Sequence, residues 1–251
     1  MEQIKSNQNS KIKLLKKLTL KKYRQESGKF VVENLAIIHD ALRGGFEFEF
    51  LFVTNEFASK NAEKFEYLER HCKKERIFLI DEKINKYFSQ LETPAGIAAV
   101  FFVRSTTLNN DRPVIYLNGV SDPGNLGAIL RTALAFGFEN IVMDENCADL
   151  YNAKVVSAAK DAIFKLSIAA DKAGEWLKKT KLPIYVTSSH GGVALGKFKT
   201  AENFVLVLGS EGQGVTEWIM KKAKVKIKIE MSDKIESLNV AVAAGVLMYE
   251  L

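Results

Sequence analysis

Three short segments of this 251-residue chain combine glycine with small polar side chains. The first, residues 118–127, leads into a helix that carries Arg131. The second, residues 208–214, follows a strongly apolar run, and the third, residues 236–240, opens the last apolar stretch. Glycine permits tight turns and a close backbone approach to a ligand, and the free N–H groups at a helix start favour an anion. The sequence therefore predicts binding or catalysis at these three places.

The residue types in the segments restrict the chemistry. Arg131 can meet a phosphate with a rigid bidentate fork. The glycines of 209–214 are spaced G-x-x-G-x-G, which is the reverse of the dinucleotide fingerprint, and no P-loop lysine follows. Glu211 inside this loop would repel phosphates and suits a cationic ligand or a hydroxyl donor. Ser237 can cap the last helix, whereas Asn239 is left without such a role. An ordinary capped helix or strand-to-helix turn remains the alternative for each segment.

Strands alternate with helices from residue 113 onward, which predicts a mainly parallel sheet with helices on both faces. Continuously apolar strands such as 203–208 are typical of strands covered on both sides. The expected strands are 114–118, 140–143, 164–168, 183–187, 203–208 and 225–230, and the expected helices are 125–137, 151–160, 172–180, 214–223 and 236–250. In such sheets, ligands bind outside the carboxyl ends of the strands.

A smaller α/β unit is expected over residues 1–104. A polar, turn-rich linker, 105–112, separates it from a second domain over 113–251. Within the smaller unit we expect helices at 10–24, 36–43, 58–73 and 82–88, with Ser10 and Asp81 as N-caps, and strands at 30–32, 48–54, 77–80 and 97–103.

Composition excludes several classes of protein. With 47% hydrophobic and 26% charged residues, the chain is typical of soluble globular proteins. Its two cysteines, Cys72 and Cys147, are too far apart for a disulfide framework, and the three histidines lack metal-ligand spacing, so no metal is expected. The absence of a membrane-length apolar run or a secretory signal leads us to expect a cytoplasmic protein with no membrane partner.

The basic charge is concentrated at the N-terminus. Residues 1–30 contain nine Lys or Arg and two Glu, whereas the rest of the chain is nearly neutral. A concentrated positive field attracts polyanions. The candidate RNA-binding residues are Lys13, Lys16, Lys17, Lys21, Lys22 and Arg24. A solvated lysine-rich helix face is the alternative, and a membrane surface is disfavoured because aromatic anchors are absent.

In this order, the three segments resemble the three motifs of the SpoU (TrmH) family of RNA ribose 2′-O-methyltransferases. The matching residues are 122–127 with Arg131, 209–214 and 237–240, within a resemblance that covers about residues 112–251. The N-terminal part resembles, less specifically, a ribosomal-protein-like RNA-binding domain through residues 21–24, 30–33 and 93–97.

The resemblance implies a trefoil-knotted α/β domain, S-adenosylmethionine as methyl donor, a homodimer with its interface beside the cofactor pocket, and RNA as substrate, ribosomal RNA rather than transfer RNA. By the same resemblance, the cofactor-binding residues are Gly209, Ile229 and Leu238, with Met231, Gly212 and Thr187 as further contributors. The residues around the reacting ribose are Asn125, Arg131, Glu211, Ser237 and Asn239. Because a guanidinium rarely loses its proton, we expect Arg131 to stabilise the phosphate and the developing alkoxide electrostatically.

Four residues depart from the family pattern, among them Ala159 in place of a usual serine and Asn34 in place of a common glycine. Glu230 replaces the usual proline and is expected to add charge near the cofactor loop, and Asp161 replaces a usual glycine and is expected to strain a turn. A non-catalytic RNA-binding relative with a degraded cofactor pocket is therefore an alternative hypothesis. A nucleotide-dependent oxidoreductase is a third one, although the chain lacks its glycine fingerprint and downstream acidic ribose ligand.

Overall fold

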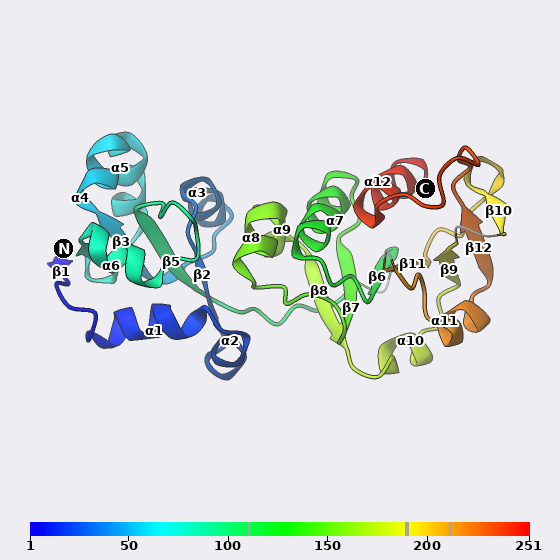
Figure 1. Ribbon diagram of the computed structural model, residues 1–251, viewed down its shortest axis with the longest axis horizontal. Helices are drawn as coiled ribbons and strands as arrows, with labels where there is room; N and C mark the ends of the chain where they lie inside the picture. Colours follow the sequence, from blue (N-terminus) through cyan, green and yellow to red (C-terminus); the bar gives the residue numbers. More distant parts are fainter. Residues whose placement is uncertain (110, 189–190, 211) are drawn as a thin grey trace. The chain divides into compact units, whose positions relative to one another are not determined.

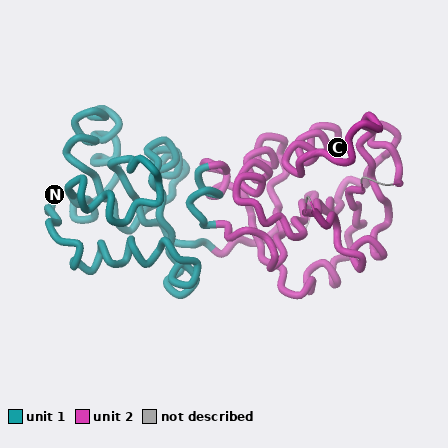
Figure 2. Tube along the Cα trace, in the orientation of Figure 1, with its two compact units in different colours: residues 1–104, 151–157 teal, residues 105–150, 158–251 magenta. Residues whose placement is uncertain are grey.

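The computed structural model describes residues 1–109, 111–188, 191–210 and 212–251. The chain divides into two compact units, residues 1–104 with 151–157, and residues 105–150 with 158–251 (Figure 2). Each unit has its own sheet (Figure 1). Residues 151–157 follow the second unit's first strands in sequence but belong to unit 1, where Tyr151 packs on Phe30 with ring centroids 4.4 Å apart.

Unit 1 is a mixed five-stranded sheet with helices. Its elements are β1 (Glu2–Gln3), α1 (Ser10–Leu18), α2 (Lys21–Ser27), β2 (Lys29–Val32), α3 (Leu35–Arg43), β3 (Phe48–Thr54), α4 (Asn55–Lys60), α5 (Ala62–His71), the 3₁₀ turn η1 (Lys74–Arg76), β4 (Ile77–Ile80), α6 (Glu82–Phe88) and β5 (Ile97–Phe102). The strand order is β1-β4-β3-β5-β2, with β5 antiparallel to both of its neighbours. Asp81 caps α6 as predicted, accepting a hydrogen bond from the Ile84 N–H at 2.7 Å.

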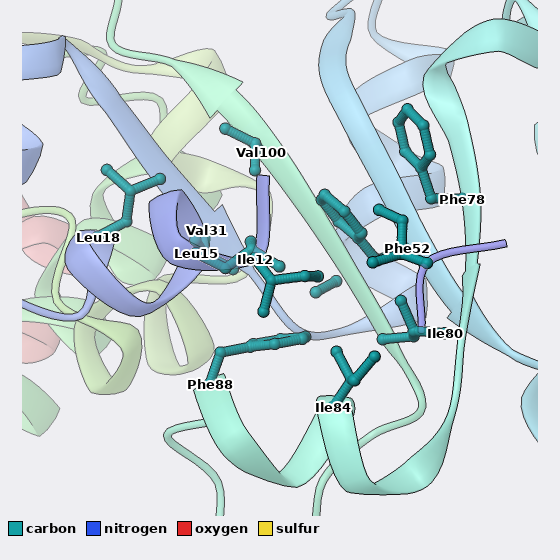
Figure 3. Packing of buried hydrophobic residues seen from close by; sticks show 12 residues of the cluster. Ile12, Leu15, Leu18, Val31, Phe52, Phe78, Ile80, Ile84, Phe88 and Val100 are labelled. Carbon is teal, nitrogen blue, oxygen red and sulfur yellow. The ribbon is translucent and has the colours of Figure 1, made fainter. Parts of the chain in front are cut away.

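Helix α1 belongs to the basic N-terminal segment and packs its apolar residues into the core of unit 1 (Figure 3). Its Ile12, Leu15 and Leu18 are at most 1% exposed and pack with sheet and α6 residues. The single helix expected over 10–24 is wrong, because the backbone at Leu20 is extended and α2 begins afresh at Lys21. The N-cap is Asn9, not Ser10.

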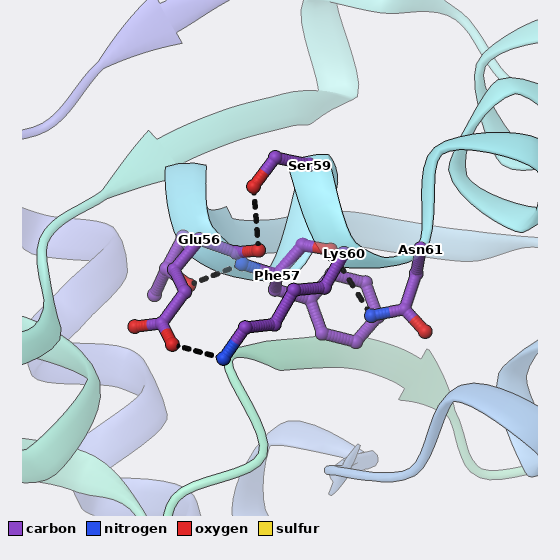
Figure 4. A network of polar contacts seen from close by, with 6 residues as sticks. Glu56, Phe57, Ser59, Lys60 and Asn61 are labelled. Atoms are coloured by element: carbon purple, nitrogen blue, oxygen red, sulfur yellow. Dashed lines mark hydrogen bonds and ion pairs between the residues drawn. The ribbon is translucent and has the colours of Figure 1, made fainter.

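The helix expected over 58–73 is also divided, into α4 and α5. Asn61 separates them, and its side-chain amide donates to the Phe57 carbonyl oxygen at 3.0 Å, which satisfies a carbonyl at the end of α4 (Figure 4). Ser59 and a Glu56–Lys60 ion pair complete this polar network. The hydrogen bond from Lys60 lowers the pKa of the Glu56 carboxyl.

Unit 2 is built on a seven-stranded parallel sheet, which confirms the predicted class. Its elements are β6 (Val114–Asn118), α7 (Pro123–Ala135), β7 (Asn140–Asp144), α8 (Ala153–Ala159), of which 153–157 belong to unit 1, α9 (Ala162–Lys165), β8 (Ser167–Asp171), α10 (Glu175–Lys179), β9 (Ile184–Thr187), β10 (Val193–Ala194), η2 (Leu195–Lys197), β11 (Val205–Gly209), α11 (Glu217–Lys222), β12 (Val225–Lys228) and α12 (Val240–Glu250). The order is β10-β12-β9-β11-β6-β7-β8, and every pairing is parallel.

Helices cover both faces of this sheet, as expected. Figure 1 shows α7 and α12 on one side and α10 and α11 on the other. Gly245 of α12 faces Thr132 of α7, and a Cβ at Gly245 would lie 3.8 Å from the Thr132 Cγ2 atom. On the opposite side, Leu177 and Ile219 are fully buried against the strands. The last helix of the chain therefore packs against the first helix of unit 2.

Local expectations in unit 2 are wrong at three places. Where a strand was expected over 164–168, the chain forms the short helix α9, and β8 begins only at Ser167. Helix α12 begins at Val240, and its cap is Asn239, whose Oδ1 accepts from the Ala241 and Val242 N–H groups at 2.9 and 3.3 Å. Ser237, the expected cap, precedes it. At the turn before α9, Asp161 has an ordinary φ of −77°. The left-handed residue is Lys160, with φ of 57°.

Candidate active site

A cavity of about 400 Å³ lies at the carboxyl ends of β9, β11 and β12, beneath the start of α12. Its lining includes all six residues that the sequence predicted for cofactor binding: Thr187, Gly209, Gly212, Ile229, Met231 and Leu238. They come from three separate stretches of the chain, which the parallel sheet brings together because the strands end at the same edge.

The loop after β11 folds back on itself at Gly209. A Cβ atom at this position would lie 2.2 Å from the carbonyl carbon of Gly214 and 2.3 Å from the nitrogen of Val215. The Gly214 N–H donates to the Ser210 carbonyl oxygen at 2.9 Å, and Gly214 itself has a left-handed φ of 66°. Only glycine fits at position 209, and the left-handed φ of Gly214 also favours glycine.

The walls of the cavity combine apolar side chains with exposed backbone. Ile227, Val240 and Leu247 supply apolar surface, whereas Gly212 and Gly214, which have no side chains, supply main-chain atoms. Glu236 adds a carboxylate. These features fit S-adenosylmethionine in size and chemistry, because a flat purine suits the apolar wall and a cationic sulfonium suits a site with a nearby carboxylate.

The first and third motifs meet through two asparagines. The Asn239 side-chain nitrogen donates to the Asn125 Oδ1 atom at 3.0 Å, across 114 residues of sequence. Asn239 thus has two roles, because its own Oδ1 caps α12. Ser237 lines the cavity next to this pair. Glu211 lies outside the described residues.

Arg131 lies on α7, six residues after Asn125, and is exposed. It does not line the cavity, and no ion pair joins it to another residue that the structure describes. Glu230 is also exposed and is not part of the lining, although Ile229 and Met231 on either side are. Glu230 therefore lies between two cavity residues without lining the cavity itself, and its charge near the cofactor loop stays a prediction.

The predicted RNA-binding residues fall into two groups. The five lysines on α1 and α2, namely Lys13, Lys16, Lys17, Lys21 and Lys22, are exposed. Arg24 is 5% exposed, and its Nη1 donates to the Leu18 carbonyl oxygen at 2.7 Å. The assignment of Arg24 to RNA binding is therefore corrected: its guanidinium is buried and holds the corner between α1 and α2.

Sequence reasoning missed a polar network behind the cavity. Asp144 accepts a hydrogen bond from the Asn118 side chain at 2.7 Å, and Asn118 accepts one from the Thr216 N–H at 2.8 Å. Burial and the neighbouring Asp144 raise the pKa of the Cys147 thiol to about 12. The available signal was a polar residue ending an apolar strand, which Asn118 and Asp144 share.

Within the described part of the chain, no cluster of three or more His, Cys, Asp or Glu side chains is arranged to hold a metal ion. No described helix combines the length and apolar character needed to cross a membrane.

The substitution Gly209→Ala tests the loop geometry. The added methyl group collides with main-chain atoms, so the loop must open and the cavity must change shape. We expect the affinity for S-adenosylmethionine, measured by calorimetry, to fall by about tenfold or more. Gly196→Ala is the matched control, because nothing lies within 4 Å of the place that its methyl group would take. Equal affinity of both variants would contradict the role given to the loop.

Comparison with known proteins identifies both parts of the chain. Residues 112–249 match the SpoU rRNA Methylase family, and residues 9–99 match the MRM3-like substrate binding domain. The chain is 30% identical over its whole length to the 23S rRNA (guanosine(2553)-2′-O)-methyltransferase RlmP of Bacillus subtilis, of which it covers 99%.

Solved structures agree with this result. An RNA 2′-O ribose methyltransferase superposes with a TM-score of 0.81 at 29% identity, over 99% of this chain and 97% of that one. An AdoMet-bound rRNA methyltransferase from Sinorhizobium meliloti superposes with a TM-score of 0.82 at 25% identity, over 99% and 96% of the two chains. Since the family model covers residues 112–249 and the Bacillus subtilis relative matches the whole chain, the chain belongs to the SpoU rRNA methylase family.

Proposed function

We propose that this protein transfers a methyl group from S-adenosylmethionine to a ribose 2′-hydroxyl of ribosomal RNA. The observation that carries the proposal is the convergence of the second and third motifs on one cavity, with the Asn125–Asn239 hydrogen bond joining the first motif to it. When bound, S-adenosylmethionine supplies an electrophilic methyl group on a sulfonium sulfur.

The residues of the chain supply binding and orientation. We call the loop after β11, residues 209–214, the glycine loop. This loop and the apolar wall bind the nucleoside part of the cofactor. The paired amides of Asn125 and Asn239 orient the acceptor ribose, since each amide carries both donors and an acceptor. Arg131 stabilises the negative charge that develops on the 2′-oxygen and on the adjacent phosphate. Alignment of the reacting atoms accounts for a large part of the rate acceleration.

The exposed lysines of α1 and α2 bind RNA phosphates. Phosphate contacts give affinity and register but do not select a sequence. The relative from Bacillus subtilis is named for a guanosine of 23S rRNA, which makes 23S rRNA the first substrate to test here.

The enzyme acts as a knotted homodimer in this proposal. Val242, Val246 and Tyr249 form an exposed apolar stripe on α12, at 55%, 39% and 77% exposure. The Tyr249 ring meets the ring of Phe136, itself 44% exposed, with centroids 5.9 Å apart. A second copy of the chain is the occupant that would cover this stripe, beside the start of α12 where the cavity lies. The knotted topology is what the likeness to the SpoU family implies for this chain.

The non-catalytic alternative depended on damage to the cofactor pocket. Because the Glu230 side chain lies outside the cavity lining, we favour the enzyme over an RNA-binding relative.

Arg131→Ala tests the catalytic assignment. We expect methyl transfer to 23S rRNA to fall by about 100-fold or more, the usual effect of removing one charge-stabilising donor, while the cofactor affinity stays within about twofold. Transfer is measured with radiolabelled S-adenosylmethionine and affinity by calorimetry. The control is Arg112→Ala, another exposed arginine, which pairs with Glu139. Unchanged turnover of the Arg131 variant would remove this residue from the mechanism.

Replacement of Lys13, Lys16 and Lys17 by Gln tests the RNA-binding helix without removing the buried residues of α1. We expect weaker RNA binding and a salt dependence whose slope is smaller by about two to three, since each phosphate contact contributes about 0.7 to 0.9. The control replaces the exposed Lys64, Lys73 and Lys74 in the same way, with the same change in charge. An identical slope for the two triple variants would mean that the α1 lysines form only a solvated face.

Val246→Asp tests the dimer. A carboxylate in the apolar stripe must be desolvated on association, so we expect sedimentation analysis to give the 28.1 kDa mass of one chain for the variant and twice that mass for the wild type. Val193→Asp, at an exposed valine of β10, is the control and should remain dimeric. A dimeric Val246 variant would place the interface elsewhere.

A further inference from the structure

Asp144 is a hydrogen-bond acceptor for two different loops. It is the last residue of β7 and receives hydrogen bonds from the Asn118 side-chain nitrogen at 2.7 Å and from the Gly119 N–H at 3.0 Å. The Asn146 N–H and the Cys147 thiol also donate to it, at 3.1 and 3.3 Å. An ionised carboxylate only accepts hydrogen bonds, so this set of donors is matched to an Asp.

Asn118 transmits this constraint to the glycine loop. It ends β6 directly opposite Gly209 in the strand register and is 5% exposed. Because Asp144 binds its side-chain nitrogen, its Oδ1 is oriented toward the Thr216 N–H, which donates at 2.8 Å across 98 residues of sequence. Thr216 comes two residues after Gly214 and precedes α11.

The network therefore fixes two segments of the site relative to each other. On one side, Gly119 begins the loop that leads to Asn125 and Arg131. On the other side, Thr216 ends the loop that lines the cavity. The two loops meet nearby, since a Cβ at Gly119 would lie 3.8 Å from the Cβ atom of Ser210, a cavity residue.

We propose that Asp144 and Asn118 are positioning residues. They fix the glycine loop, which follows β11 and leads to Thr216, relative to the loop that begins at Gly119 and leads to Asn125 and Arg131. This inference rests on the proposed function and adds to it two residues that contact neither the methyl donor nor the ribose. If the Asn118–Asp144 or Thr216–Asn118 hydrogen bond is lost, the chain that leaves the glycine loop at Thr216 is no longer held in place, and cofactor binding becomes weaker.

An exchange of the two side chains tests the proposal. Asp144→Asn alone offers Asn118 an amide in place of a carboxylate and removes the constraint on its orientation. Asn118→Asp alone sets two carboxylates against each other at hydrogen-bond distance. In the double variant, the amide at position 144 donates to the carboxylate at position 118, whose other oxygen accepts from Thr216.

We expect each single variant to lower the calorimetric affinity for S-adenosylmethionine by about tenfold or more, and the double variant to recover most of it. A matched control is Asp171→Asn. Asp171 ends β8 opposite Asp144, is 2% exposed, and accepts from Tyr116, Trp176 and Leu177 instead of the site loops. That control should lower the thermal midpoint and leave the affinity unchanged.

A surface variant keeps the test decisive if the buried variants fail to fold. Thr216 is exposed and has φ of −59°, which proline adopts readily. Thr216→Pro removes the N–H that bonds Asn118 and places the ring Cδ atom where the hydrogen was, so the Asn118 amide must turn away, whereas Thr216→Ala retains the bond. We expect the proline variant to bind S-adenosylmethionine about tenfold more weakly than the alanine variant.

The outcomes separate this inference from the proposed function. A wild-type protein that binds no S-adenosylmethionine would contradict the proposed function itself. If the wild type binds, then equal affinities of the two Thr216 variants, unchanged affinity in the single variants, or a double variant no better than the singles would overturn the inference alone.

Discussion

The site depends on one steric constraint at the end of β11. The backbone of the returning loop occupies the space that a side chain at position 209 would need. The loop returns so closely that a Cβ at position 209 would lie 2.2 Å from the Gly214 carbonyl carbon, and three glycines of this loop line the cavity. A loop held by its own backbone offers a preformed surface, so little conformational entropy is lost when a ligand binds. The neighbouring strand supports it, because Asn118 of β6 lies opposite Gly209 and binds Thr216 at the loop exit.

The parallel sheet explains why distant parts of the sequence meet there. Strands β9, β11, β6 and β7 lie in consecutive positions with the same direction, so their carboxyl ends form one edge. Asn125 and Asn239 meet above this edge because α7 and α12 pack on the same face of the sheet. In the proposed function this arrangement separates two tasks: strand ends and loops hold the cofactor, and the paired helices hold the acceptor ribose.

The sequence predicted most strands because their apolar runs are buried on both faces, although α9 (Ala162–Lys165) occupies the start of the strand expected over 164–168. The six residues that the family resemblance assigned to cofactor binding all line the cavity. Positions that depend on tertiary contacts were not predictable. The cap of α12 is Asn239 and not Ser237, since the chain between them extends toward the cavity, and Arg24 is buried by a backbone contact at the α1–α2 corner. Charge pattern alone cannot distinguish such an arginine from its exposed neighbours. Asp144 belonged to no motif, and its role follows only from the hydrogen bonds that join the end of β7 to the end of β6.

The chain thus pairs a basic, helix-bearing unit with a unit whose cavity fits the methyl donor, and the proposed function depends most on that cavity. The most direct test is a calorimetric titration of the purified protein with S-adenosylmethionine, repeated with S-adenosylhomocysteine. We predict saturable binding of both, with one molecule per chain, because the two ligands share the nucleoside and amino-acid parts that the cavity walls contact. Failure of the folded protein to bind either ligand, with ribosomal RNA absent or present, would contradict the proposed function.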